Sequence, residues 1–460
     1  MKFKILHTND IHGHLEHWPV IKQFIQEKQQ SYQEQQLPYL TIDIGDAMDT
    51  VHPMVEASAG QIMVECFNSI PYDMVTLGNN EGLNFTQEEL SRQYQNAKFD
   101  ILISNLLNAQ TGKAPDWAHT YQIRSVGKLN IAFFALTAPY KTYTLNGYTI
   151  IQPMDAIEAV LEKIKRHPSI DMIILLSHLG LPTDRSIATA FPEIALVLGA
   201  HTHHVLFEGE LVGSTLLAAA GRYGDYVGEV TIDIDEENTI HSEAIVHSTS
   251  QLAKNYGIDI SNDCYYKEGQ QLLKRKIVGH LSHPYYALDK TSSNSFIQLA
   301  LEAISWATDV ELAMLNTGLF LIDLPSGNVS KKSLHEALPH PMHLARLTLS
   351  GEQLLEMLYE IDGQVDDLQF KLINGLGFRG KIFGEVVYKG IAYDSVSYQW
   401  LVHGLPIDKT KEYQLITVDH LWFLPFFPTI SKYANPQLIF PDFLRHVVEK
   451  YIRHISENDN

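Results

Sequence analysis

The first half of the chain alternates short apolar runs with amphipathic segments. The runs are rich in Ile, Val, Leu and Phe, and each has about the length of a β-strand. They cover residues 3–7, 39–44, 74–77, 101–104, 131–136, 172–177 and 194–198. Buried strands that alternate with helices are typical of α/β proteins. The alternation therefore predicts an α/β fold for this half of the chain.

The segments between these runs carry helix signals. Residues 20–30 and 155–166 place apolar side chains three and four positions apart, as on one face of a helix. Before residues 87–96, Thr86 stands at the N-cap position and Glu89 follows three residues later, which is a capping-box pattern. We expect a helix at each of these places.

The length of the chain, 460 residues, exceeds that of one ordinary domain. We expect a first domain over residues 1–250, a charged connecting helix over residues 255–278 and a second domain over residues 280–455. The second domain mixes helical patterns with strand-like runs. The helical patterns cover residues 293–308 and 350–359, and the strand-like runs cover residues 312–315, 344–349, 391–398 and 413–418. This mixture predicts a smaller α+β domain.

The charge of the chain narrows the range of partners. The sequence has 54 acidic and 34 basic residues and a formal net charge of −20, which repels nucleic acids and anionic membranes at long range. The N-terminus becomes polar by His7, unlike a signal peptide, and no stretch approaches the ~20 apolar residues of a membrane span. We expect a cytoplasmic protein that binds neither a nucleic-acid polymer nor a membrane; the oligomeric state stays open.

Polar residues that can bind metals follow five of the apolar runs. In α/β sheets, ligands bind outside the carboxyl ends of the strands, so side chains that are far apart in the sequence can meet there. We therefore expect a metal site formed by Asp10, His12, Asp46, Asn79, His178, His201 and His203.

This set of ligands favours particular ions and a particular reaction. Imidazoles, carboxylates and an amide form a mixed nitrogen and oxygen shell, which suits Mn, Zn, Co or Fe better than Ca or Mg. The set is too large for one tetrahedral ion, and a shared carboxylate makes two divalent ions natural. Two ions about 3.5–4 Å apart can hold both the attacking and the departing oxygens of a phosphate.

The order of these motifs resembles that of the calcineurin-like metallophosphoesterases. The opening sequence His7-Thr8-Asn9-Asp10-Ile11-His12-Gly13 is similar to that of the 5′-nucleotidase branch in particular. The resemblance implies a four-layer α/β/β/α sandwich followed by a C-terminal substrate-binding domain. It also implies that Asp46 bridges two metals, one held with Asp10, His12 and His203, the other with Asn79, His178 and His201.

The sequence departs from the family pattern beside the metal-binding Asn. The family has a His at the position of Asn80 and the nucleotidases have an Asp at the position of Leu83. An amide donates a hydrogen bond but cannot give up a proton at neutral pH, and loss of a general acid costs about 10²–10⁴-fold on that step. By position, Asn80 and Glu81 are the catalytic candidates. His14 and His52 are open alternatives.

The second domain departs from the family as well. The family motif Asn-x-Gly-Gly-Ile-Arg is replaced by Asn316-Thr317-Gly318-Leu319-Phe320-Leu321, without the anion-binding Arg. The family's aromatic loop is replaced by residues 423–428. The substrate-binding candidates that remain are Arg379 as an anion ligand and Phe426 or Phe427 as a stacking surface.

The resemblance implies a metal-dependent phosphohydrolase that cleaves phosphate esters of nucleotides with a metal-activated water. The alternatives are a phosphohydrolase of cyclic nucleotides, nucleotide diphosphate derivatives or sugar phosphates, and a non-catalytic protein that binds metal or nucleotide.

Overall fold

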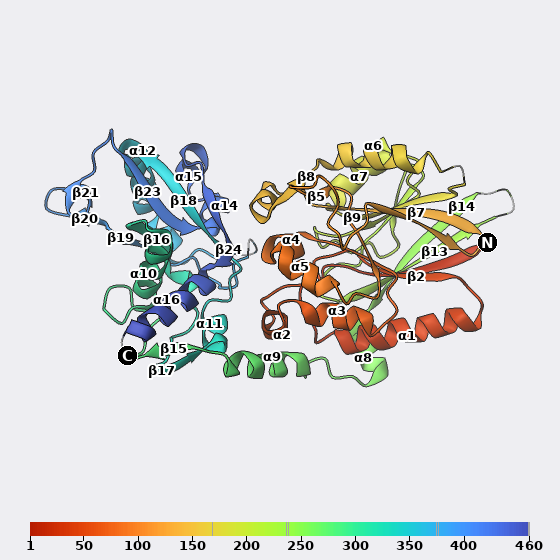
Figure 1. Cartoon of the computed structure of the whole chain (residues 1–460), viewed down its shortest axis with the longest axis horizontal. Helices are drawn as coiled ribbons and strands as arrows, with labels where there is room; N and C mark the ends of the chain where they lie inside the picture. Colours follow the sequence, from red (N-terminus) through yellow and green to blue (C-terminus); the bar gives the residue numbers. More distant parts are fainter. Residues whose placement is uncertain (168, 236, 238, 374, 376, 459–460) are drawn as a thin grey trace. The chain divides into compact units, whose positions relative to one another are not determined.

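The chain is built from two units, Met1–Gly269 and Gln270–Asn460 (Figure 1). The computed structural model describes residues 1–167, 169–235, 237, 239–373, 375 and 377–458. Each unit has an apolar core of its own. Within the described residues, no helix combines the length and the apolar character that crossing a membrane requires.

Two six-stranded mixed sheets form the centre of the first unit. The first sheet has the order β14-β13-β1-β2-β3-β4, and β1 to β4 are parallel neighbours. Its strands are β1 (Lys2–Thr8), β2 (Tyr39–Asp43), β3 (Met74–Thr76), β4 (Asp100–Leu102), β13 (Tyr226–Ile234) and β14 (Ile240–Ser248). This parallel order brings the carboxyl ends of β1, β2 and β3 to one edge of the sheet.

The second sheet has the order β11-β12-β10-β9-β7-β6, with β7, β9, β10 and β12 parallel. Its strands are β6 (Tyr121–Val126), β7 (Leu129–Thr137), β9 (Met172–His178), β10 (Leu196–Gly199), β11 (Glu210–Val212) and β12 (Thr215–Ala218). The apolar runs predicted from the sequence are therefore confirmed as strands.

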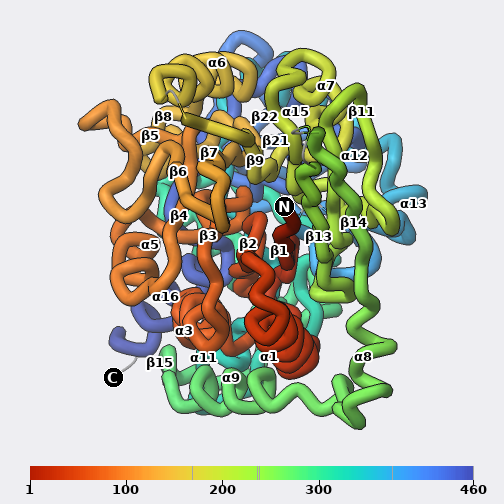
Figure 2. Tube along the Cα trace, turned by 90° about the vertical axis from the view of Figure 1, so that its right-hand side faces the viewer, coloured from red at the N-terminus to blue at the C-terminus, as the bar shows by residue number. Residues whose placement is uncertain are grey.

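The packing of these sheets makes the four layers. Side chains such as Ile5 and Phe133 fill the core between the two sheets. Alternate residues of the second sheet, such as Phe134, face the helices α6 (Pro153–Ile164) and α7 (Leu181–Ala190). Helices α1 (Trp18–Glu34) and α3 (Gln61–Asn68) cover the opposite outer side (Figures 1 and 2). The predicted α/β/β/α sandwich is confirmed.

Shorter elements complete the first unit. They are α2 (Pro53–Ala57), α4 (Asn79–Asn84), α5 (Gln87–Tyr94), β5 (Leu106–Asn108), the 3-10 helix η1 (Lys141–Asn146) and β8 (Tyr148–Ile150). The capping box that opens α5 has the predicted form, because Thr86 Oγ1 accepts from Glu89 N and Glu89 Oε2 accepts from Thr86 N.

The prediction of a single helix over residues 255–278 is wrong. The segment holds the end of α8 (Thr249–Tyr256), then α9 (Cys264–Arg275) and the first residues of β15 (Ile277–Leu281). Gly257 ends α8 in a left-handed conformation with φ of 68°, and the side chains of Asp259 and Asp263 bind backbone N–H groups of the turn and of α9. The chain divides into its two units inside α9.

The second unit has the expected α+β character. A five-stranded sheet has the order β19-β16-β23-β18-β24. Its strands are β16 (Leu312–Asn316), β18 (His343–Ser350), β19 (Val386–Lys389), β23 (Glu412–Val418) and β24 (Gln437–Phe443). The helices are α10 (Phe296–Thr308), η2 (Thr317–Leu319), α11 (Lys331–Ala337), α12 (Gly351–Asp362), α13 (Val365–Leu368), α14 (Asp419–Phe423), α15 (Pro428–Tyr433) and α16 (Leu444–Asn458).

Two small sheets flank this core. β15 pairs with β17 (Gly327–Ser330), and a three-stranded sheet contains β20 (Ile391–Asp394), β21 (Gln399–Val402) and β22 (Leu405–Pro406). The prediction of a single strand over residues 391–398 is wrong. Asp394 accepts from the backbone N–H groups of Val396 and Ser397, which turns the chain back into β21.

Candidate metal centre

The predicted metal ligands follow parallel strands of both sheets. Asp10 and His12 follow β1, Asp46 follows β2, and Asn79 opens α4 after β3. His178 is the last residue of β9, and His201 and His203 follow β10. The two sheets meet here, because His178 Nδ1 lies 2.7 Å from Ile44 O and His201 N donates to the carboxylate of Asp10 at 3.1 and 3.2 Å. The structure thus brings all the predicted ligands together.

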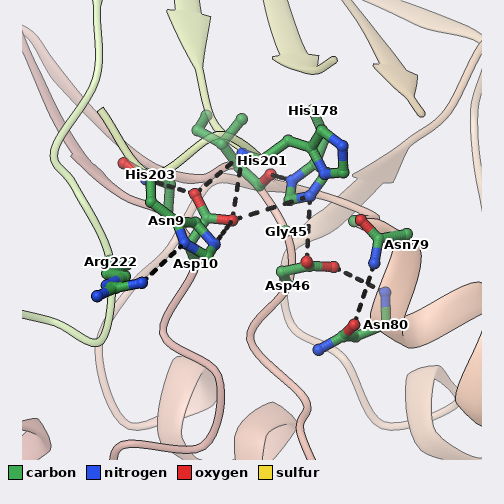
Figure 3. Close-up of polar contacts among 12 residues, drawn as sticks. Asn9, Asp10, Gly45, Asp46, Asn79, Asn80, His178, His201, His203 and Arg222 are labelled. Atoms are coloured by element: carbon green, nitrogen blue, oxygen red, sulfur yellow. Dashed lines mark hydrogen bonds and ion pairs between the residues drawn. The ribbon is translucent and has the colours of Figure 1, made fainter. Parts of the chain in front are cut away.

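Their side chains form two groups that could each hold an ion. Asp10, His12 and His203 make one group, and Asp46, His178 and His201 make the other. Figure 3 labels Asp10 and His203 of the first group and all three residues of the second. Asp46 Oδ2 lies 3.7 Å from His12 Nε2 and 3.3 Å from His178 Nε2, so one carboxylate oxygen faces both groups.

The backbone at the site is unusual. The residues Asp10, His12, Asp46, His201 and His203 all have positive φ angles, between 49° and 75°. Residues other than glycine rarely adopt this left-handed conformation, and such conformations persist where the surrounding structure enforces them, often at functional sites. Here they turn consecutive polar side chains of each loop toward one point.

The orientation of buried donor atoms fits a metal. His178 Nδ1 faces the carbonyl of Ile44, so Nδ1 carries a proton and Nε2 is the nitrogen that can bind a metal once a cation displaces its proton. That Nε2 and Asn79 Oδ1 are both buried and have no hydrogen-bond partner within the described part of the chain. A metal-binding histidine typically donates its other N–H to a carbonyl or a carboxylate. The geometry therefore matches a metal ligand shell.

The electrostatics of the site also fit a bound cation. Burial alone would lower the pKa of His178, but Asp46 outweighs burial and raises that pKa to about 10. Burial alone would raise the pKa of Asp46, but His178 and His12 hold it below its usual range. The site thus stabilises a positive charge between these side chains. A divalent cation would compete with protons for the same lone pairs.

Glu81 holds the loop that carries Asp46. Its buried carboxylate accepts hydrogen bonds from the backbone N–H groups of Asp46, Ala47, Met48 and Gly78, at 2.7 to 3.0 Å. Burial raises the pKa of Glu81 to about 7, with the charge of Asp46 adding to the shift, while the N–H donors oppose it. These contacts give Glu81 a positioning role. The catalytic role predicted from its position in the motif stays a prediction.

Gly78 is required for this arrangement. A Cβ at Gly78 would lie 2.0 Å from Asp46 Oδ1 and 2.4 Å from Asp46 N, so no other residue fits beside the loop. The Gly before Asn79 in the sequence therefore serves the close approach of two loops, in addition to starting α4.

Asn80, the other predicted catalytic residue, lies at the metal ligands. Its backbone N–H donates to Asp46 Oδ1 at 2.7 Å, and its Nδ2 lies 2.9 Å from His12 Nδ1. Asn79 Nδ2 donates to Asn80 Oδ1 at 3.1 Å. Asn80 is therefore placed to orient His12 and Asn79, and a direct contact with substrate stays a prediction.

Several neighbours of the ligands were not predicted from the sequence. Asn9 Nδ2 donates to Asp10 Oδ2 at 2.8 Å and to Gly221 O at 2.7 Å, and Asp49 Oδ2 lies 3.6 Å from His12 Nδ1. Asn9 and Asp49 stand next to the predicted motifs, which is a signal that could have found them.

Arg222 is a further unpredicted neighbour, and it brings a positive charge to the site (Figure 3). Its Nη1 lies 3.5 Å from His203 Nδ1, and its guanidinium lies 4.6 Å from the centroid of the Tyr223 ring. It comes from the loop after β12, more than a dozen residues beyond the last ligand, so no local sequence pattern links it to the metal ligands.

The two open histidines lie near the first group. His14 Nδ1 lies 2.6 Å from Glu16 Oε1, and His52 Nε2 lies 3.0 Å from Asp263 Oδ2. His52 Nδ1 accepts from Met54 N at 3.1 Å and thereby caps α2. Both nitrogens of His52 are therefore occupied, whereas His14 is held through one nitrogen.

In the second unit, the predicted substrate-binding residues do not lie together. Arg379 lines a cavity of about 490 Å³ together with two other cations, Lys290 and Lys381. Phe427 is only 1% exposed and belongs to the apolar core, so its prediction as a stacking surface is wrong. Phe426 is half-buried and contacts Phe383 and Lys371, away from the lining of that cavity.

Comparisons with known proteins place the chain in a family. Residues 3–205 match the calcineurin-like phosphoesterase model, and residues 277–422 match the 5′-nucleotidase C-terminal domain. A Bacillus subtilis protein named an uncharacterized metallophosphoesterase, YunD, is 33% identical over 97% of this chain and 98% of its own length. A Vibrio cholerae 5′-nucleotidase is 22% identical over 78% of this chain and 75% of its own length.

Solved structures agree with this fold. A Staphylococcus aureus protein described as a proposed 5′-nucleotidase, in complex with α-ketoglutarate, has a TM-score of 0.67 at 17% identity over 98% of this chain and 96% of that one. The Haemophilus influenzae NAD nucleotidase has a TM-score of 0.61 at 17% identity over 99% of this chain and 97% of that one. With the site and the sequence matches, these findings show that the chain is a phosphoric ester hydrolase of the 5′-nucleotidase family of calcineurin-like metallophosphoesterases.

Proposed function

We propose that this chain hydrolyses phosphate esters of nucleotides at a centre of two divalent ions. The observation that carries the proposal is the position of Asp46 Oδ2, which faces both groups of ligands at 3.3 and 3.7 Å. One ion would take Asp10, His12, Asp46 and His203, and the other Asp46, Asn79, His178 and His201. The mixed nitrogen and oxygen donors favour Mn, Zn, Co or Fe.

Bound ions of this kind supply a water of lowered pKa as nucleophile and neutralise charge on the phosphoryl oxygens. The residues of the chain provide the rest. Asn9, Glu81 and the carbonyl of Ile44 hold Asp10, Asp46 and His178 in place before substrate arrives. Pre-organised ligands spare the reaction the cost of reorientation.

The departing oxygen needs a proton or a positive charge. Asn80 donates only hydrogen bonds at neutral pH, so it does not replace a general acid. The guanidinium of Arg222, beside His203, provides a fixed positive charge at the edge of the centre. We propose that it contacts the departing oxygen and offsets its negative charge, while water supplies the proton, since arginine suits the geometry of phosphate esters.

Nucleotides are the proposed substrates because named relatives of this chain are 5′-nucleotidases. Nucleotide diphosphate derivatives are the second candidate, since a structural neighbour is named an NAD nucleotidase. The cavity lined by Arg379, Lys290 and Lys381 suits a second anionic group, which a nucleotide diphosphate derivative carries and a nucleoside monophosphate does not.

The test is phosphate release by the purified chain with Mn, Co, Zn and Fe in turn. The substrates are nucleoside monophosphates, cyclic nucleotides, nucleotide diphosphate derivatives and sugar phosphates. Asp46→Ala serves as the blank, and Asp116→Ala, an exposed acidic residue of the same unit, serves as the matched control. Turnover by the wild type and the control alone supports the proposal. If the protein binds metal but releases no phosphate from any substrate, the result contradicts the proposal and favours a binding role.

A further inference from the structure

A cavity of the first unit adjoins the metal centre. It has a volume of about 470 Å³, and His12, one of the metal ligands, lines it. The other walls come from the loop after β1, the loop before α2 and residues 260–267 at the start of α9. A cavity of this size can hold a small-molecule ligand.

One wall of the cavity carries a fixed imidazole and carboxylate pair. His14 Nδ1 lies 2.6 Å from Glu16 Oε1, and the imidazole stacks on Tyr223 with ring centroids 4.0 Å apart. Burial alone would raise the pKa of Glu16, but the hydrogen bond and charge of His14 outweigh burial and lower it. The carboxylate is therefore ionised, and its remaining lone pairs can accept further hydrogen bonds.

The lining carries a second pair of the same kind. His52 Nδ1 accepts from Met54 N, so His52 is the neutral tautomer that donates from Nε2 to Asp263 Oδ2 at 3.0 Å. Asp263 also accepts from Tyr266 N at 2.9 Å, which fixes it at the start of α9. The Tyr266 ring packs edge-on against His52 at 5.6 Å and is 42% exposed.

The charges of the lining select the kind of ligand. Glu16 and Asp263 are negative, and among the described lining residues Lys267 is the only Lys or Arg. Two carboxylates disfavour a second phosphate, which would be repelled. They favour hydroxyl groups, because ionised carboxylates only accept hydrogen bonds. Val51, Ile260 and the Tyr266 ring supply apolar surface between these acceptors.

We propose that this cavity binds the leaving group of the phosphate ester, and that this leaving group is a hydroxyl-rich sugar. The hydroxyls would donate to Glu16 and Asp263, while the phosphate lies at the metal centre beyond His12. The inference rests on the proposed function. It goes further by placing the selectivity for the sugar in the first unit.

The test compares two substrates of the Mn-loaded full chain. Ribose 5-phosphate has a hydroxyl-rich leaving group, and p-nitrophenyl phosphate has an apolar one. The variant is Glu16→Gln combined with Asp263→Asn, which keeps the shape of both side chains and removes both charges. Lys274→Ala, an exposed residue of α9 outside the lining, is the matched control. In parallel, D-ribose is titrated into each protein by calorimetry, which does not depend on turnover.

The double variant is expected to raise KM for ribose 5-phosphate about tenfold or more, since each hydrogen bond to a charged group contributes about that factor. KM for p-nitrophenyl phosphate should rise much less, and the heat of D-ribose binding should vanish. Equal changes in both KM values, or no change in either, would overturn the proposal. If the double variant does not fold by circular dichroism, Glu16→Gln and Asp263→Asn are measured separately, and each is expected to raise KM for ribose 5-phosphate while KM for p-nitrophenyl phosphate stays nearly unchanged.

The two proposals can fail separately. If the wild type releases no phosphate from any ester, the proposed function fails. D-Ribose binding that the double variant abolishes then still supports the sugar cavity. If D-ribose does not bind to an active wild type, the proposed function stands and the sugar cavity is overturned.

Discussion

The two units of the chain have kept different amounts of the family pattern. In the first unit, every expected metal ligand is present and all of them converge on one site. In the second unit, the family's arginine is missing from the motif at residues 316–321, and Phe427 of the replaced aromatic loop is buried in the core. The difference shows that the first unit keeps the side chains of the candidate metal site together, whereas the second unit lacks the side chains that the family pattern assigns to substrate binding.

The physical reason lies in how each site is held. The ligands of the first unit stand on buried strand ends, and their carboxylates and imidazoles contact one another at 3.2 to 3.9 Å. Loss of one donor would leave the others with unbalanced charge. In the second unit, what remains of the motif serves packing. Asn316 Nδ2 donates to Phe383 O, and a Cβ at Gly318 would lie 1.9 Å from Ile382 O.

The largest expected effect is that of Asp46→Ala. The variant removes the carboxylate that faces both groups of ligands, and metal ions contribute several kcal/mol to such reactions, so kcat/KM should fall by about 10³-fold or more. Phosphate release and metal content by mass spectrometry measure the loss. Asp116→Ala should match the wild type. Full activity in Asp46→Ala would mean that the candidate metal site of the first unit is not needed for catalysis, and the contrast with the second unit would be lost.

Glu81→Gln comes next. The amide nitrogen cannot accept from the backbone N–H groups that the carboxylate binds, so the loop of Asp46 should loosen and metal affinity should fall about 10–100-fold. Activity should return at saturating metal. If kcat instead falls while the metal content is unchanged, Glu81 acts in the reaction, as its position in the motif predicted.

Asn80→Ala should lower kcat about tenfold, because residues that orient metal ligands typically contribute 10–100-fold. The variant loses the contacts to His12 and Asn79 but keeps the backbone hydrogen bond to Asp46. Steady-state kinetics on one nucleoside monophosphate measure the change. An unchanged kcat would show that the amide side chain is dispensable at this position.

Arg379→Ala addresses the second unit. One partly exposed cation contributes about 1 kcal/mol, so KM for a nucleotide diphosphate derivative should rise about fivefold with little change in kcat. Lys409→Ala, an exposed residue of the same unit, is the control. A fall in kcat as large as that of the metal-ligand variants would mean that the second unit takes part in the chemical step.

Phe427→Ala should have the smallest effect on catalysis. Truncation of a buried Phe costs about 3–5 kcal/mol of stability, so the urea midpoint of unfolding should drop. KM of the folded protein should stay at the wild-type value because the ring lies in the core. A rise in KM without loss of stability would restore Phe427 as a substrate contact.

The strands of the first unit and the candidate metal ligands at their ends could be predicted because these signals are local, whereas the four-layer sandwich was implied by the family resemblance. Each donor directly follows an apolar strand, and parallel strands end at one edge. The environment of Glu81 could not be predicted, since its partners in residues 46–48 lie more than thirty positions away. The burial of Phe427 and the approach of Arg222 to His203 also depend on packing between distant segments, which no local pattern encodes.

A centre of two ions in the first unit requires two equivalents of Mn²⁺ per chain. The decisive measurement is a calorimetric titration of Mn²⁺ into the metal-stripped full chain, with Asp46→Ala beside the wild type. We expect the wild type to bind two equivalents and the variant to lose affinity markedly at both positions. One equivalent or none in the wild type, or unchanged binding in Asp46→Ala, would rule out a two-ion centre bridged by Asp46.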